Sequence, residues 1–129
     1  MPSPAPVLVV DDDRDVREAL VETLEFAGFP CIGAANGKEA LDALRGASVQ
    51  PLAVLLDLMM PVMDGYGFLE EQRRDPAIRG IPVFVLTAGG ALDVARIAPP
   101  APQLIRKPIH VVELLAALAV DQLSPVLGE

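Results

Sequence analysis

The sequence predicts an α/β protein with a five-stranded parallel sheet that carries helices on both faces. Two observations support this fold class. Short hydrophobic runs alternate along the chain with segments in which hydrophobic residues recur at helical spacing. Three of the runs, Val7–Val10, Leu52–Leu56 and Ile81–Leu86, are apolar throughout, which is typical of strands buried on both faces. Such strands require helices on each side of the sheet, joined by right-handed connections.

The first strand is expected over residues 7–10, where β-branched valine predominates. A helix over residues 13–27 follows, because its hydrophobic residues lie on one side at a helical period. Asp12 or Asp13 can cap the start of this helix, and Gly28 provides its C-terminal stop. One strand and one helix therefore occupy the start of the chain.

The same alternation then repeats. Residues 29–35 predict a second short strand. The Asn36–Gly37 pair turns the chain into a second helix, whose hydrophobic side includes Leu41 and Leu44.

The third strand, residues 52–56, is apolar and is followed directly by Asp57. After a loop, a helix over residues 65–74 presents Phe68 and Leu69 to the core.

The last third of the chain supplies two more strands and two more helices. Residues 81–86 predict the fourth strand, and residues 104–106 the fifth. The helix between them is confined to residues 91–98, because glycines precede it and prolines follow it. A final helix over residues 110–123 is apolar on nearly all sides, so part of its surface is expected to face a partner.

Length and composition indicate one cytoplasmic domain. The chain has 129 residues, which we divide into a flexible lead-in (1–6), one domain (7–123) and a tail (124–129). The net charge of −8 argues against nucleic-acid binding, which requires a basic face. The lone Cys31 is expected to be a buried, reduced thiol. No signal peptide or apolar run of membrane-spanning length is present, so no membrane association is expected.

Polar residues follow four of the strands directly. They are Asp11 and Asp12, Asp57, Thr87, and Lys107. Because the carboxyl ends of parallel strands meet at one edge of the sheet, these side chains are expected to surround one point. Crowded carboxylates favour a cation, and Mg2+ binds carboxylates while also accepting phosphate oxygens. A carboxylate can attack phosphorus to form an acyl phosphate, with a hydroxyl and an ammonium group stabilising the transferred group.

Five segments resemble the receiver domains of two-component response regulators, in that family's order and close to its spacing. They are residues 9–13, 36–41, 57–65, 86–88 and 107–108, of which 57–65 is the most specific. The resemblance covers about residues 6–123 and is nearest to single-domain chemotaxis receivers. It implies a flavodoxin-like, doubly wound fold with the strand order 2-1-3-4-5.

The resemblance also assigns roles to individual residues. It makes Asp57 the phosphoacceptor. Asp11 and Asp12 would be an acidic pair that holds Mg2+, with Asp12 as a direct ligand and the main-chain carbonyl of Met59 as a further ligand. Thr87 and Lys107 would stabilise the phosphoryl group, and Lys107–Pro108 would be a cis peptide. The phosphoryl donor would be a histidine kinase or a histidine phosphotransfer protein. The chain would then be a switch, with no enzymatic activity beyond assisting its own phosphorylation and dephosphorylation.

Two features depart from the family pattern. The segment from Thr87 to Lys107 is about two residues short, with a helix broken by prolines, and the switch position differs. Receivers usually have an aromatic switch residue three positions before the lysine, and this chain has Leu104. Leucine can fill the space but cannot act as a hydrogen-bonding ring that turns with the threonine. A degenerate receiver that binds partners without phosphorylation is therefore an alternative. A haloacid-dehalogenase-like phosphatase with Asp11 as nucleophile and Asp13 as its second aspartate is another, although it leaves residues 57–65 unexplained.

The final helix bears on the partners of the protein. Its apolar surface suggests docking of a downstream target or formation of a weak homodimer, with a monomer as the other expected state.

Overall fold

The computed structural model describes residues 5–58, 60, 62–87, 97, 102–106, 110 and 112–118. Five strands form one parallel sheet with the order β2-β1-β3-β4-β5, as the sequence predicts. The strands are β1 (Val7–Val10), β2 (Cys31–Ala34), β3 (Ala53–Asp57), β4 (Val83–Thr87) and β5 (Gln103–Arg106). β3 lies in the middle of the sheet and carries Asp57 as its last residue.

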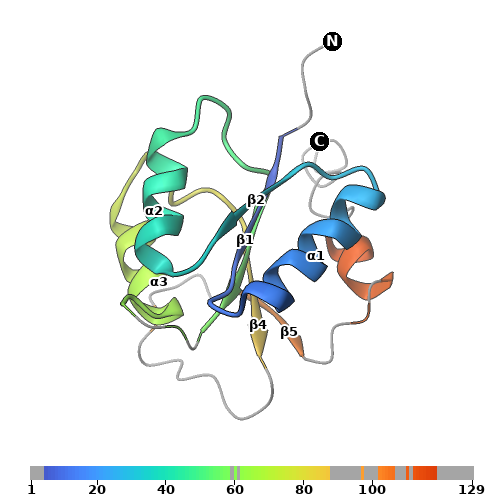
Figure 1. Cartoon of the computed structure of the whole chain (residues 1–129). Helices are drawn as coiled ribbons and strands as arrows, with labels where there is room; N and C mark the ends of the chain where they lie inside the picture. The colour runs from blue at the N-terminus through green and yellow to red at the C-terminus, as the bar shows by residue number, and fades with distance from the viewer. Residues whose placement is uncertain are drawn as a thin grey trace.

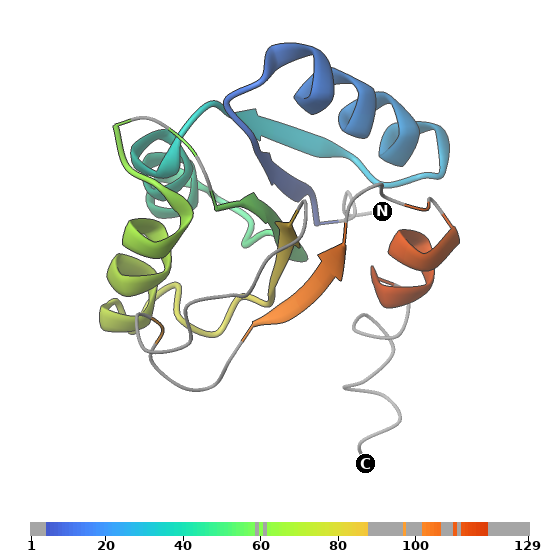
Figure 2. The same cartoon turned by 90° about the horizontal axis from the view of Figure 1, so that it is seen from below.

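Helices cover both faces of this sheet (Figures 1 and 2). The labelled helices are α1 (Arg14–Phe26), α2 (Gly37–Gly46) and α3 (Gly65–Arg74). A further helix spans residues 112–118 and is called the C-terminal helix below. α1 and the C-terminal helix lie on one face, whereas α2 and α3 lie on the other. None of the helices in the described part of the chain is long and apolar enough to span a bilayer.

Each face of the sheet has its own hydrophobic core, because successive strand residues point to opposite sides. In β1, Leu8 and Val10 face α2 and α3, whereas Val7 and Val9 face α1 and the C-terminal helix. All four side chains are fully buried. The unbroken apolar runs in the sequence therefore reflect burial on both faces.

Three side-chain caps begin the labelled helices. Asp13 caps α1, because its carboxylate accepts hydrogen bonds from the N–H groups of Asp15 at 2.9 Å and Val16 at 3.2 Å. Asn36 and Asp64 cap α2 and α3 in the same way. Of the two aspartates that could cap the first helix, Asp13 is therefore the one that does, which leaves Asp12 available to the site.

The observed β2 is shorter than the predicted strand over residues 29–35. The N–H of Phe29 donates to the carbonyl of Leu24 at 2.9 Å, so Phe29 belongs to the C-terminal turn of α1. Gly28 provides this turn with its φ of 99°. β4 likewise begins later than predicted, because the N–H of Ile81 donates to Ile78 in a turn.

Some predicted segments lie outside the described residues. The helix predicted over residues 91–98 is described only at Ile97, which is buried. The end of the predicted final helix (119–123), the tail (124–129) and residues 1–4 of the lead-in are also outside the described part. The proposed division into lead-in, domain and tail therefore stays a prediction.

Cys31, on the edge strand β2, is half-buried, whereas the sequence suggested full burial. Desolvation, together with the charge of Glu25, raises the pKa of its thiol to about 11. Because only the thiolate reacts with iodoacetamide, alkylation at pH 8 should be about a hundredfold slower than for an ordinary thiol. Mass spectrometry would follow the reaction, and the guanidinium-unfolded protein should react at the ordinary rate. Equal rates in both states would contradict the raised pKa.

Candidate functional site

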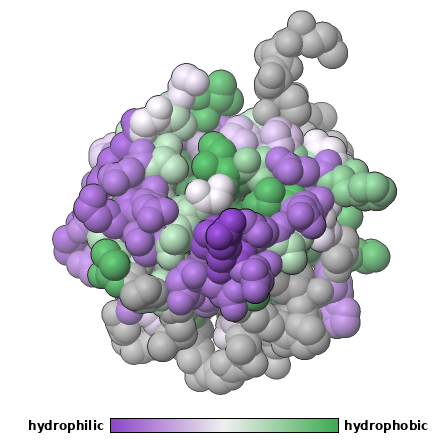
Figure 3. All heavy atoms as spheres, in the orientation of Figure 1, coloured by the Kyte–Doolittle hydropathy of each residue, from purple (hydrophilic) through white to green (hydrophobic). Residues whose placement is uncertain are grey.

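The strand register brings two acidic segments together at one edge of the sheet. Val10 of β1 pairs with Leu56 of β3, so the residues that follow them, Asp11 and Asp57, lie at the same level. This edge is formed by the carboxyl ends of the strands, as the sequence predicts. Hydrophilic side chains gather over the nearby start of α1 (Figure 3).

The carboxylates of Asp11, Asp12 and Asp57 form a compact cluster. Each can offer one oxygen such that all three oxygens lie within 4.8 Å of one another. Asp11 is only 2% exposed, Asp57 is half-buried and Asp12 is exposed. Three negative charges at this separation repel each other unless a cation lies among them. The donor set consists of carboxylate oxygens and is open on the Asp12 side, which suits Mg2+ with part of its water shell retained.

Asp11 is held in place by main-chain bonds as well as by its side chain. Its N–H donates to the carbonyl of Ala34 at 3.1 Å, and its Oδ1 accepts from the N–H of Asp13 at 2.9 Å. A guanidinium nitrogen of Arg17 donates to the main-chain carbonyl of Asp11 at 2.7 Å. Sequence reasoning missed Arg17, because the contact depends on how α1 packs beside the loop that follows β1.

The side chain of Arg17 passes close to Gly33 on β2. A Cβ at this position would lie 3.3 Å from Arg17 Cδ, which is closer than most such contacts. The sequence does show an arginine one turn into the helix that follows the acidic segment. This pattern alone does not identify the carbonyl group that Arg17 contacts.

The other predicted site residues are described to different degrees. Thr87 ends β4, is half-buried and pairs in register with Arg106 of β5. Leu104 lies on β5 with its side chain 49% exposed. Lys107, Pro108 and Met59 lie outside the described residues, and so do the predicted cis peptide and the predicted carbonyl ligand.

The loop after Asp57 is fixed by close main-chain packing at Gly65. The N–H of Gly65 donates to the carbonyl of Leu58 at 2.8 Å, which ties the start of α3 to the end of β3. A Cβ on Gly65 would lie 2.6 Å from Leu58 Cα and 2.9 Å from the carbonyl oxygen of Asp57. No side chain fits at these distances, so only glycine allows this arrangement.

One further contact and one unusual backbone conformation characterise the same loop. The N–H of Gly37 donates to the carbonyl of Met63 at 2.9 Å, which joins the loop to the start of α2. Val62 has a φ of 68°, a conformation that β-branched residues rarely adopt and that costs on the order of 1–3 kcal/mol.

The alternative pairing of Asp11 with Asp13 has less geometric support. The Asp13 carboxylate caps α1, and Asp13 is not part of the three-carboxylate cluster. Asp57, which that alternative leaves unexplained, is part of it.

Comparisons with known proteins identify one family. The family model for the response regulator receiver domain matches residues 7–119. The response regulator MprA of Mycolicibacterium vanbaalenii is 41% identical over 117 residues, which cover 89% of this chain and 49% of that protein. MprA of Mycobacterium avium is 40% identical over 114 residues, covering 87% and 48%. The chain thus spans about half the length of these curated relatives.

Solved structures show the same fold. The chemotaxis protein CheY4 of Vibrio cholerae superposes with a TM-score of 0.77 and 30% identity, covering 89% of this chain and 96% of that one. A putative response regulator from Chloroflexus aurantiacus gives a TM-score of 0.80 with 32% identity, covering 92% and 97%.

Proposed function

The chain belongs to the response regulator receiver domain family, and from this premise we propose that it is a phosphorylation switch whose phosphoacceptor is Asp57. The observation that carries the proposal is the cluster formed by Asp57 with Asp11 and Asp12 at the carboxyl edge of the sheet. The donor would be a histidine kinase or a histidine phosphotransfer protein.

Asp57 would act as the nucleophile. One of its carboxylate oxygens forms a bond to phosphorus, while the P–N bond of a phosphohistidine breaks and its electron pair returns to the imidazole. Asp57 is the last residue of β3, the central strand of the sheet, and this strand would support the carboxylate during the attack. The hydroxyl of Thr87 would donate a hydrogen bond to the transferred group, and Lys107 would pair with its charge.

Asp11 and Asp12 would hold Mg2+ together with Asp57 and the main-chain carbonyl of Met59. When bound, Mg2+ would neutralise negative charge between the carboxylates and the phosphoryl oxygens. Asp11 is rigidly placed by Ala34, Asp13 and Arg17, whereas Asp12 is exposed and open to solvent. This difference supports Asp12 as the ligand that a metal reaches directly.

The test is phosphoryl loading in the full-length chain. The protein is incubated with acetyl phosphate, with and without Mg2+, and its intact mass is measured. A gain of one phosphoryl group that requires Mg2+, mapped to Asp57 by borohydride reduction and peptide sequencing, is the expected result. An unchanged mass with both acetyl phosphate and a phosphorylated histidine phosphotransfer protein would favour the degenerate receiver and overturn the proposal.

Asp12→Asn should weaken Mg2+ binding by about a hundredfold or more. Removal of groups that merely orient metal ligands already costs 10–100-fold in affinity, and Asp12 would be a ligand itself. The fold should be unaffected because Asp12 is exposed. Calorimetric titration with Mg2+ measures the effect, and Asp15→Asn, which removes the same charge from the exposed first turn of α1, is the control. Equal losses in both variants would indicate a general charge effect.

Arg17→Ala should weaken Mg2+ binding by about tenfold, because the loop that carries Asp11 and Asp12 loses a charge-assisted hydrogen bond. This residue positions the acidic pair and does not touch the metal. Arg17→Lys keeps the positive charge and can still donate a hydrogen bond, so it should recover part of the affinity. The same Mg2+ titration is used, beside urea unfolding of each variant. An Arg17→Ala protein with lowered stability but unchanged Mg2+ affinity would show that Arg17 is only structural.

A further inference from the structure

A pocket lies at the amino ends of β4 and β5, at the edge of the sheet opposite to Asp57. Its volume is about 300 Å³, and its lining comes from the end of α3, the loop between α3 and β4, and the starts of the two strands. Val83 lines the pocket and begins β4, whereas Thr87 ends that strand at the edge that carries Asp57. The four residue steps between them span about 13 Å. A molecule bound in this pocket would therefore leave the phosphoacceptor uncovered.

Two arginines line the pocket. Arg73 is half-buried in the last turn of α3, and Arg79 is exposed in the loop that follows. The described residues that line the pocket include no acidic side chain. Burial lowers the pKa of the Arg73 guanidinium, because a charged group loses hydration when it is partly covered. An anion in the pocket would offset part of this loss, since charges attract more strongly at such a site than in open water.

The carboxylates near the end of α3 pair with other cations. Glu70 pairs with Arg74 at 2.8 Å on the exposed side of the helix. Asp75 accepts a hydrogen bond from Nε of Arg45 on α2 at 3.1 Å. Neither Arg74 nor Arg45 lines the pocket. Within the part of the chain that the structure describes, Arg79 has no ion pair, so its charge is available to a ligand.

The loop that carries Arg79 is fixed by a buried amide. Gln72 on α3 is fully buried, and its Nε2 donates to the carbonyls of Ile78 and Ile81 at 3.0 Å each. The N–H of Arg79 itself donates to the carbonyl of Asp75 at 2.9 Å. The main chain of this side of the pocket is therefore set before a ligand arrives, which lowers the entropy that binding would cost.

The remaining walls of the pocket are largely apolar. They include Ile81, Pro82, Val83 and Pro102, and the exposed Gln103 adds an amide that can donate or accept a hydrogen bond. The pocket volume equals that of about ten water molecules, roughly twice what the five non-hydrogen atoms of a phosphate ion would fill. An anionic group bound to the arginines would therefore leave room for a small organic group against the apolar walls.

We propose that this pocket binds a small phosphate monoester, with the phosphate between Arg73 and Arg79 and the organic group against Pro82 and Pro102. A guanidinium group presents paired N–H donors that match the oxygens of a phosphate. A phosphate monoester carries a charge of about −1.5 to −2 at pH 7, which matches two arginines, whereas a carboxylate or a sulfate ester supplies a single charge. The inference goes beyond the proposed function, because binding at this edge of the sheet does not require phosphorylation.

The test is a titration of the full-length, 15N-labelled chain with phenyl phosphate, without Mg2+ and at constant ionic strength. The amide signals of Gly80 and Val83 report on the pocket, and those of Asp12 and Asp13 report on the carboxylate edge. Gly80 and Val83 should shift, with a dissociation constant on the order of 1 mM for a ligand of this size. The Asp57→Asn protein should bind equally well, which separates this inference from phosphoacceptance.

Two further probes test the chemistry of the ligand. Phenyl sulfate has the same shape with a single negative charge, and it should bind about tenfold more weakly because one arginine is left without a matching charge. Inorganic phosphate lacks the ring, so it should also bind more weakly than phenyl phosphate.

Variants locate the binding. Arg79→Gln should weaken binding of phenyl phosphate at least tenfold through the loss of a charge-assisted hydrogen bond, and the fold should be unaffected because Arg79 is exposed. Arg73→Gln should have a similar effect, with urea unfolding as a check on the fold. Arg74→Gln is the matched control, because it removes the same charge from the next residue, which does not line the pocket.

Four outcomes would overturn the proposal. They are unshifted Gly80 and Val83 signals, shifts confined to the carboxylate edge, equal losses of affinity in Arg79→Gln and Arg74→Gln, and binding of phenyl sulfate or inorganic phosphate as tight as that of phenyl phosphate. The third would indicate a general charge effect, and the fourth would show that the pocket does not recognise a phosphate monoester.

Discussion

Asp57→Asn should abolish phosphoryl loading, with no phosphorylated mass detectable after incubation with acetyl phosphate and Mg2+. The amide nitrogen and oxygen of asparagine are far poorer nucleophiles toward phosphorus than a carboxylate, so the acyl phosphate does not form. The variant also removes one of the three charges that would hold Mg2+. Intact-mass measurement over time checks the prediction.

The control is Asp15→Asn, which makes the same chemical change on the exposed first turn of α1 and should load like the wild type. Loading that persists in Asp57→Asn would place the nucleophile elsewhere, with Asp11 as the first candidate.

Gly65→Ala should destabilise the fold by about 3 kcal/mol and slow loading about tenfold or more. The new methyl group would lie 2.6 Å from Leu58 Cα and 2.9 Å from the Asp57 carbonyl oxygen. Because both are main-chain atoms, the clash cannot be relieved by a change of rotamer. The loop and the end of β3 must move, and the Asp57 carboxylate moves with them.

Gly46→Ala is the matched control, because a Cβ there has no heavy atom within 4 Å. Gly46 is the last residue of α2, where alanine has the higher helix propensity, so this variant should be neutral or slightly stabilised. Urea unfolding and the loading assay are compared for both variants. A Gly65→Ala protein that matches Gly46→Ala in both measurements would contradict the packing described for the loop.

The sequence predicts the five strands because hydrophobic periodicity reports directly on burial, whereas the order of the strands follows only from the resemblance to receiver domains. The predicted first strand matches β1 residue for residue, and the predicted third helix matches α3. The errors occur at strand ends, where local bonding competes with periodicity. Phe29 is apolar and precedes a strand, yet its N–H completes the turn that ends α1. Periodicity does not identify that turn.

The sequence predicts the part of the site that is formed by residues at the ends of strands. The clustering of Asp11, Asp12 and Asp57 needs only parallel strands in the right order. The sequence does not reveal contacts that depend on how the helices pack against the sheet and its loops. The Arg17 bond to Asp11 and the need for glycine at position 65 require knowledge of main-chain positions in neighbouring elements.

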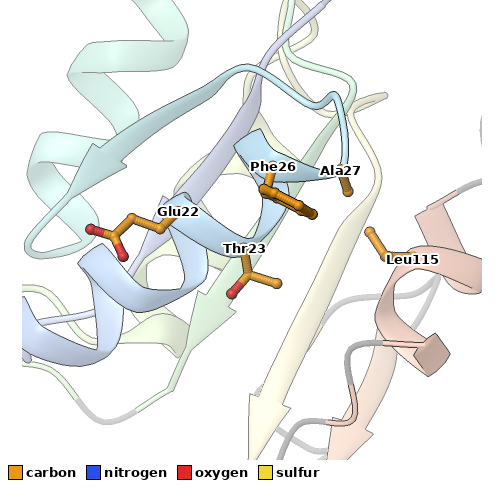
Figure 4. A pocket seen from close by; sticks show the side chains of 5 residues that line it. All are labelled: Glu22, Thr23, Phe26, Ala27 and Leu115. Carbon is orange, nitrogen blue, oxygen red and sulfur yellow. The ribbon is translucent and has the colours of Figure 1, made fainter.

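The surroundings of Phe26 could be predicted from the sequence only in part. It lies out of phase with Leu20 and Leu24, so its exposure could be derived from helical geometry. The pocket of about 600 Å³ that Phe26 lines together with Leu115 could not be derived in this way, because Leu115 belongs to a helix from the other end of the chain (Figure 4).

The central place of β3 has a consequence for how long a signal can persist. β3 is hydrogen-bonded to a strand on each side, and four of its five residues are buried. Local openings of a protein occur mainly at termini and loops, whereas central strands exchange their amide hydrogens only when the whole molecule unfolds. An acyl phosphate on Asp57 would therefore be hydrolysed within the intact fold, and its lifetime would be set by how the surrounding side chains admit water.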